Sequence, residues 1–275
     1  MNKCDLKIIL IAASLLLMPN LSAAVGLSFS DNQVFSHGYI NFRQTGPLYF
    51  TDYPFSRSGK RLVFQTSYRQ LYDIRELTDN RAALALSLNS VDFGAAAAVF
   101  GKADYFQQMG ISIFANYTRQ AFTLGISAVY SNLSFNDNYD DISWSGVNTG
   151  IAYLKNDWLF FAAGRNLNRP RYYSGSDKLP IQLEVGTSYY SQSGLENQVK
   201  TLFTSDQKPS AELSQSFVFT DYASLDWSLV LRPVRIGAGV VLRKGYFEFD
   251  YNFSHHPVLG GTHTINLSIC TTGKK

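Results

Sequence analysis

The sequence predicts an all-β protein, a transmembrane antiparallel β-barrel of about 14 strands. Three observations favour this fold class: an N-terminal export signal, a composition poor in charge and rich in aromatic residues, and repeated short segments in which apolar and polar residues alternate. Only helices and closed barrels satisfy every backbone hydrogen bond within lipid. An exported chain without apolar helices of spanning length must therefore close its strands into a barrel if it crosses a membrane.

Residues 1–24 have the order of a secretory signal peptide. Lys3 and Lys7 precede an apolar stretch, residues 8–18, which is followed by Pro19 and by the small-residue site 22–24 that ends at Ala24. The apolar stretch is well short of the ~20 residues that a spanning helix needs, so a signal anchor is the less favoured alternative. Cleavage is expected near Ala24, and export without a spanning helix predicts a place in the outer membrane of a Gram-negative bacterium.

Composition supports a membrane-embedded chain and argues against nucleic acid as a partner. Charged residues make up 16% of the sequence, against about 25% in ordinary soluble domains. Aromatic residues make up 15%, and the net charge of +3 is too small to indicate nucleic-acid binding. After cleavage the chain would hold one cysteine, Cys270, so an intramolecular disulfide is excluded.

The alternation is clearest in residues 181–189, where Ile181, Leu183 and Val185 alternate with Gln182 and Glu184. A strand with this period has one apolar and one polar face. Further strands are expected at 62–68, 82–88, 93–100, 111–117, 122–130, 145–154, 158–165, 213–220, 225–231, 236–243, 247–253 and 263–269. A soluble β-sandwich also alternates, but its outer face carries many charges. Here the polar face is mostly Gly, Ser, Asn, Gln and Thr, which suits a crowded lumen, so the apolar face is expected to meet lipid.

The lengths of the connections predict the strand count. Short connections at Ser90, Gln120 and Asn156 alternate with longer loops, as they do in barrels whose periplasmic turns are short. One further strand within 195–204, which alternates poorly, keeps every short connection on the periplasmic side and makes the count fourteen. The barrel is thus expected over residues 59–271. Residues 25–58 precede it as a periplasmic or luminal segment, because the prolines within them disfavour a strand.

Two stretches resemble a known family. The run "NTGIAYLKNDWLFFAAGRNLNRP…KLPIQLEVGTSYY" over 148–190 and the end "FEFDYNFSHHPVLGGTHTINLSI" resemble the PorV/PorQ group of outer-membrane proteins, which is related to the FadL-type long-chain fatty acid transporters. The matching positions are Gly150, Tyr153, Arg165, Asn166, Leu167, Leu179, Pro180, Gly186, Tyr189, Asp250, Tyr251, Phe253, Leu259, Gly260, Thr262, His263 and Leu267. The chain departs from the family in lacking its N-terminal "N-P-A" and glycine-rich plug segment and the terminal aromatic residue common in barrel proteins.

The resemblance implies a fourteen-stranded barrel and a function. The first expectation is assistance to type IX protein secretion or to surface attachment, with outer-membrane lipid, secretion-system components or secreted proteins as partners. The alternative within the same fold is a FadL-like channel for hydrophobic small molecules.

Charged residues inside the expected strands are the candidate luminal polar residues: Arg165, Glu184, Glu248 and Asp250. Arg or Lys on the lipid face near the midplane costs roughly 2–4 kcal/mol, and Asp or Glu less, so these side chains are expected to point inward. They could form an ion-pair network that stiffens the barrel or a polar constriction that gates a path, and the sequence leaves both open.

An outer-membrane rim hydrolase is the remaining alternative, and we expect no enzyme activity, metal or cofactor. His255, His256 and His263 cluster near the C-terminus, but no cysteine or group of carboxylates completes a metal-ligand set. The chain lacks G-x-S-x-G, H-E-x-x-H and nucleotide-binding glycine motifs, although a rim enzyme requires none of them.

Overall fold

The computed structural model describes residues 48, 53–55, 62–102, 104–135, 140–171, 178–191, 193–205 and 207–271. Most of these residues belong to fourteen strands: β1 Leu62–Gln70, β2 Thr78–Leu88, β3 Val91–Lys102, β4 Phe106–Arg119, β5 Phe122–Phe135, β6 Ile142–Lys155, β7 Trp158–Arg165, β8 Gln182–Tyr190, β9 Leu195–Thr204, β10 Ser210–Thr220, β11 Ala223–Leu231, β12 Val234–Lys244, β13 Phe247–His256 and β14 Gly260–Thr271. The expected signal peptide, residues 1–24, and most of segment 25–58 lie outside the described residues. Within the described ranges, no helix is long and apolar enough to cross a bilayer.

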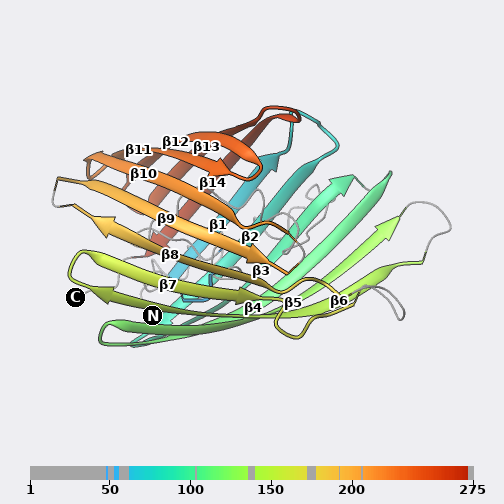
Figure 1. Cartoon of the computed structure of the whole chain (residues 1–275), viewed down its shortest axis with the longest axis horizontal. Coiled ribbons are helices and arrows are strands. Elements are labelled where there is room, and N and C mark those ends of the chain that lie inside the picture. Colours follow the sequence, from blue (N-terminus) through green and yellow to red (C-terminus); the bar gives the residue numbers. More distant parts are fainter. Residues whose placement is uncertain are drawn as a thin grey trace.

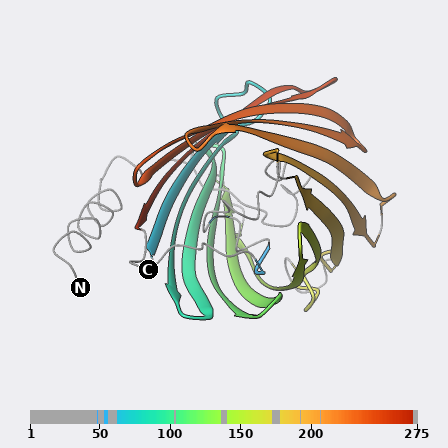
Figure 2. The same ribbon diagram turned by 90° about the vertical axis from the view of Figure 1, so that its left-hand side faces the viewer.

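The strands form one closed antiparallel barrel, which confirms the predicted fold class. Each strand pairs with its neighbours in sequence, and β1 pairs with β14 from Leu62↔Thr271 to Gln70↔His263. Figure 1 shows the tilted strands from the side, and Figure 2 looks into the ring that they enclose. Closure leaves no sheet edge, so the wall satisfies its own backbone groups, as hydrocarbon requires.

Alternation along the strands separates an apolar outside from a polar inside. In β4, Ile111, Ile113 and Tyr117 are exposed on the outer surface, whereas Ser112 and Asn116 are buried within the barrel. In β8, Leu183 and Val185 are exposed while Gln182, Glu184 and Ser188 are buried. The apolar side of the 181–189 segment therefore faces lipid, as the sequence predicts.

The connections differ between the two ends of the barrel. At one end, the short-turn end, two-residue turns join β2 to β3, β4 to β5 and β6 to β7. Asn89, Gln120 and Asn156 in these turns have positive φ angles of 55°, 54° and 54°, the conformation that two-residue hairpins favour. The other end, the long-loop end, carries connections 71–77 and 166–181. Because periplasmic turns of such barrels are short, we assign the short-turn end to the periplasm.

Strand β9, Leu195–Thr204, is the strand that the count of connections predicts, and it alternates poorly for a physical reason. Its inward residues Gln198 and Lys200 are polar and buried. Its outward residues include Asn197, which lies opposite the outward-facing Tyr189 of β8. Polar side chains thus occupy both faces of β9, and the usual contrast between the faces is lost.

Candidate functional site

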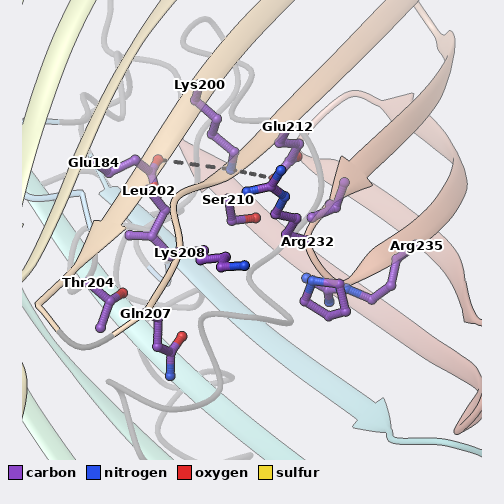
Figure 3. Close-up of a pocket in the computed structure, with 12 residues that line it drawn as sticks. Glu184, Lys200, Leu202, Thr204, Gln207, Lys208, Ser210, Glu212, Arg232 and Arg235 are labelled. Atoms are coloured by element: carbon purple, nitrogen blue, oxygen red, sulfur yellow. Dashed lines mark ion pairs between the residues drawn. The ribbon is translucent and has the colours of Figure 1, made fainter.

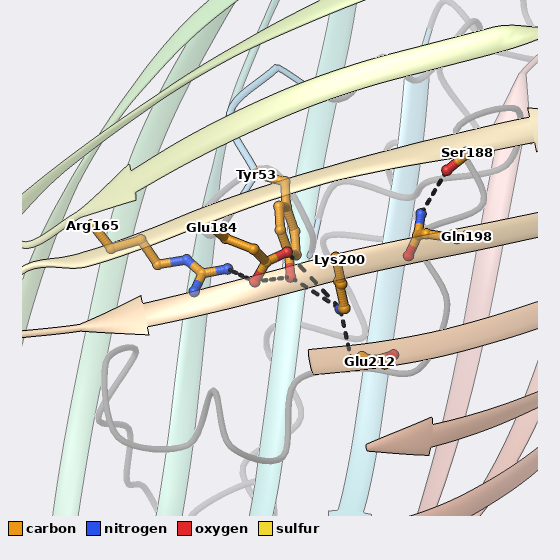
Figure 4. A network of polar contacts seen from close by, with 7 residues as sticks. All are labelled: Tyr53, Arg165, Glu184, Ser188, Gln198, Lys200 and Glu212. Atoms are coloured by element: carbon orange, nitrogen blue, oxygen red, sulfur yellow. Dashed lines mark hydrogen bonds and ion pairs between the residues drawn. The ribbon is translucent and has the colours of Figure 1, made fainter. Parts of the chain in front are cut away.

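Four neighbouring strands place a chain of ion pairs on the inner wall. Arg165 ends β7, and its Nη2 lies 3.2 Å from Oε2 of Glu184 on β8. The Nζ of Lys200 on β9 lies 3.9 Å from Oε1 of Glu184 and 3.1 Å from Oε2 of Glu212 on β10. All four side chains are at most 10% exposed, and Figure 4 shows them following one another across the strands. Charges this buried are costly unless paired, so the chain holds together as a unit.

Tyr53, from the segment before the barrel, joins this chain of charges. Its phenol donates a hydrogen bond of 3.1 Å to Oε2 of Glu184, and the ammonium of Lys200 donates one of 3.5 Å to the phenol oxygen. The guanidinium of Arg165 lies 4.9 Å from the centre of the ring. Burial raises the pKa of Tyr53, and the carboxylate of Glu184 raises it further. The phenol therefore keeps its proton and remains a donor to Glu184.

An apolar cluster lies beside the charges, also inside the barrel. Its members are Tyr53, Phe55, Ala152, Leu159, Phe161, Ala163 and Tyr190. The rings of Phe55 and Phe161 stack with centroids 5.4 Å apart, and Tyr53 meets Phe55 edge to face at 5.9 Å. Figure 2 shows the short stretch 53–55 within the ring of strands. Every member is at most 5% exposed, so the cluster is a closed apolar core between stretch 53–55 and the inner wall of β6–β8.

Two glycines in the wall make room for this stretch. A Cβ added to Gly125 of β5 would lie 1.9 Å from the carbonyl oxygen of Pro54. One added to Gly150 of β6 would lie 2.6 Å from Cδ1 of Phe55. These distances are far inside van der Waals contact, so any side chain at either position would displace the segment.

Leu48 touches the opposite wall. Its backbone N–H donates to the side-chain oxygen of Gln65 on β1 at 3.2 Å, and its side chain packs with Ala83 of β2 and Ala96 of β3. The described parts of segment 25–58 thus contact β1–β3 on one side of the lumen and β5–β9 on the other.

A small pocket opens from the ion-pair chain toward the long-loop end. It holds about 60 Å³ and is lined by Glu184, Lys200 and Glu212 in its depth and by Lys208 and Arg232 from the connections β9–β10 and β11–β12. Figure 3 shows these side chains converging, with Arg235 of β12 beside them. More cations than carboxylates line it, so the approach from the long-loop end is electropositive.

The four sequence-predicted luminal residues all lie inside the barrel, but in two separate groups. Arg165 and Glu184 form the ion pair described above. Glu248 and Asp250 lie on β13, where Glu248 accepts from Nε of Arg243 at 3.0 Å. Asp250 accepts from the amides of Asn252 and Asn266 at 2.6 and 2.8 Å. The β13 group is therefore a satisfied part of the wall, away from the aromatic cluster.

Sequence reasoning missed Tyr53, Lys200 and Glu212. Lys200 and Glu212 could have been predicted from the sequence, because each is a charged residue at an inward position of a strand, as Glu184 is. Tyr53 could not, since its contact with Glu184 joins residues 131 positions apart and exists only after the barrel closes.

The histidines do not form a metal site within the described residues. His263 faces outward near the long-loop end, where its Nδ1 meets the phenol of Tyr251 at 2.9 Å and its Nε2 meets Oδ1 of Asp73 at 3.2 Å. His256 accepts from the backbone N–H groups of Val258 and Leu259 in its own turn. These histidines therefore connect loop residues to the barrel wall, and they do not belong to the luminal ion-pair chain.

Comparison with known proteins identifies the fold rather than a family. No family model matches the chain, and no curated protein matches its sequence. The solved structure of CymD, a monoaromatic hydrocarbon channel, is 9% identical with a TM-score of 0.57, over 86% of this chain and 100% of that one. The P. putida toluene transporter TodX is 9% identical with a TM-score of 0.55, over 84% of this chain and 94% of that one.

Omp33, an outer-membrane protein of Acinetobacter baumannii, is 8% identical with a TM-score of 0.53, over 77% of this chain and 98% of that one. At such identities the likeness carries no information on ligand. Together with the closed wall and the apolar outer surface, it makes this chain an outer-membrane β-barrel.

Proposed function

We propose that the protein is a FadL-like outer-membrane channel for hydrophobic small molecules. The observation that carries this proposal is the aromatic cluster inside the barrel, where Tyr53 and Phe55 pack against Leu159, Phe161 and Tyr190. The cluster is closed in this structure, so a hydrophobic solute would reach it by displacing stretch 53–55 and would then gain about 25 cal/mol per Å² of apolar area buried.

The ion-pair chain would hold stretch 53–55 in place as the gate of this channel. Tyr53 is bound on both sides, by Glu184 and Lys200, while its ring contributes to the aromatic cluster. A hydrophobic solute that competes for Phe161 would therefore disturb the same segment that the charges hold. This gives the buried charges a function beyond stiffening the wall.

Two of the structures with this fold are described as hydrocarbon channels or transporters, which supports the proposal by analogy. The role in type IX secretion or surface attachment rests on the sequence resemblance alone and stays a prediction. We propose no enzyme activity, and the N-terminal residues 1–24 are proposed as a cleaved signal peptide.

Uptake by intact Gram-negative cells tests the channel. Cells expressing the full chain and cells carrying an empty vector are given labelled toluene at low concentration, with labelled arabinose as the hydrophilic reference. The proposal expects faster toluene uptake and unchanged arabinose uptake. Equal acceleration of both solutes would indicate a water-filled pore, and no acceleration of toluene by a folded, membrane-inserted chain would refute the proposal.

A further inference from the structure

A row of hydrogen-bonded polar side chains crosses the lipid-facing surface of the barrel. The indole Nε1 of Trp227 on β11 donates to Oε1 of Gln215 on β10 at 2.9 Å. The Nε2 of Gln215 donates to Oδ1 of Asn197 on β9 at 2.7 Å. These three residues are direct partners in the strand register and share the outer face with Tyr189. We call them the polar row.

The order of donors and acceptors along the polar row determines which of its hydrogen-bonding groups have no partner. An indole N–H can only donate, so Oε1 of Gln215 must face Trp227 and its amide nitrogen must face Asn197. The Nδ2 of Asn197 then keeps both its protons without an acceptor among the described residues, and Nε2 of Gln215 keeps one. The second lone pair of each amide oxygen is also available.

Gln215 lies deep in the bilayer, where hydrogen-bonding groups without a partner are costly. Gln215 is the sixth of the eleven residues of β10 and therefore lies near the middle of the wall. Acyl chains offer neither donors nor acceptors, and each polar group left unsatisfied in hydrocarbon costs several kcal/mol. The outer surface of β4 and β5 at similar positions is apolar, with Ile113 and Ile126 exposed. Acyl chains therefore solvate the polar row poorly, whereas they solvate the apolar outer surface of β4 and β5 well.

A cavity adjoins the polar row on the same surface. It holds about 340 Å³ and is lined mainly by Phe217, Phe219, Leu225 and Trp227, and Gln215 and Ala238 also belong to its lining. The cavity is almost entirely apolar, so a partner could place an apolar side chain there while its polar group meets Gln215.

We propose that the outer surface of β9–β11 binds a second copy of this chain, with the polar rows of the two barrels hydrogen-bonded to each other. Two copies inserted in the same membrane with the same orientation hold Gln215 at the same depth by necessity. A side-chain amide carries both a donor and an acceptor, so it can pair with its own symmetry mate in a two-fold contact. Another protein would need a matching polar group at this depth, whereas a second copy always supplies one.

Disulfide trapping in outer membranes tests the interface. Leu213→Cys places a thiol on the outer surface of β10, where Leu213 is 42% exposed, and Ile113→Cys places one on β4, where Ile113 is 62% exposed. Cys270 is buried and stays as it is. After oxidation with copper-phenanthroline, a covalent species of twice the chain mass is expected from Leu213→Cys and not from Ile113→Cys. Monomer alone from Leu213→Cys, or a product whose mass shows a different protein, would overturn the proposal.

A second pair of variants tests the polar row itself. Gln215→Leu in the Leu213→Cys chain is expected to lower the dimer fraction about tenfold, which corresponds to about 1.4 kcal/mol of association free energy. The matched control is Thr66→Leu, an outward-facing residue in the middle of β1, which is expected to change nothing. Heat-dependent gel mobility confirms that each variant is folded. An unchanged dimer fraction in a folded Gln215→Leu chain would show that the polar row does not hold the copies together.

Discussion

Glu184 is the residue on which the luminal contacts converge. It accepts from Tyr53 and Arg165 and lies 3.9 Å from Lys200, and its side chain is 3% exposed. Two cations therefore depend on it in a place where water is scarce. Among the described residues, Glu248 on β13 pairs with one cation, Arg243, and both side chains are more accessible, at 13% and 16% exposed.

This difference predicts unequal effects of two equivalent substitutions. Glu184→Gln keeps an acceptor for Tyr53 but removes the charge that compensates Arg165 and Lys200. Removing one partner of a buried pair costs about 3–5 kcal/mol, so the free energy of unfolding should fall by an amount of that order. Glu248→Gln should cost clearly less. Urea unfolding in lipid vesicles measures both, and equal losses would contradict the convergence on Glu184.

A side chain at position 125 is expected to displace stretch 53–55 from the wall of the barrel. Gly125→Leu on β5 would push Pro54 away from the lumen wall and should displace Tyr53 from Glu184, because the added Cβ alone meets the Pro54 carbonyl at 1.9 Å. The conductance of single barrels in planar bilayers should rise as the segment moves. Ala128→Leu, an outward position on the same strand, is the control and should leave conductance unchanged. Unaltered conductance in a folded Gly125→Leu barrel would mean that stretch 53–55 does not limit the path.

At the scale of the elements, the strands could be predicted because the membrane imposes a strict contrast between the two faces of a strand. β4 and β5 keep that contrast along most of their length. β9 does not, since Asn197 faces outward, and only the count of connections predicts it. β2 begins at Thr78 rather than at residue 82, because Asp79 points inward and pairs with Arg69 and Arg81.

The candidate site could be predicted only in part. Charge inside a strand is visible in the sequence, so Arg165 and Glu184 could be singled out. Their assembly with Tyr53 and Phe55 depends on closure of the barrel and on the space above Gly125 and Gly150, which no local pattern contains.

The two ends of the barrel predict the orientation of the molecule. Val258, in the connection β13–β14 at the long-loop end, is 84% exposed, and Tyr246, in the turn β12–β13 at the short-turn end, is 49% exposed. If the short turns are periplasmic, a membrane-impermeant maleimide added to intact cells should label Val258→Cys and not Tyr246→Cys. Both should be labelled once the outer membrane is permeabilised. Labelling of Tyr246→Cys alone in intact cells would invert the assignment.

For the molecule as a whole, we propose that hydrophobic molecules pass through the barrel at its aromatic cluster. β7 offers a matched pair of adjacent residues: Phe161 faces inward and is 5% exposed, whereas Phe160 faces lipid and is 48% exposed. The deciding measurement is the rate of toluene uptake by cells expressing Phe161→Asn or Phe160→Asn, each confirmed as a folded barrel by its heat-dependent gel shift. Uptake is expected to fall to the level of empty-vector cells with Phe161→Asn and to stay near that of the unaltered chain with Phe160→Asn. Equal uptake by the two variants would show that hydrophobic molecules do not pass at the aromatic cluster.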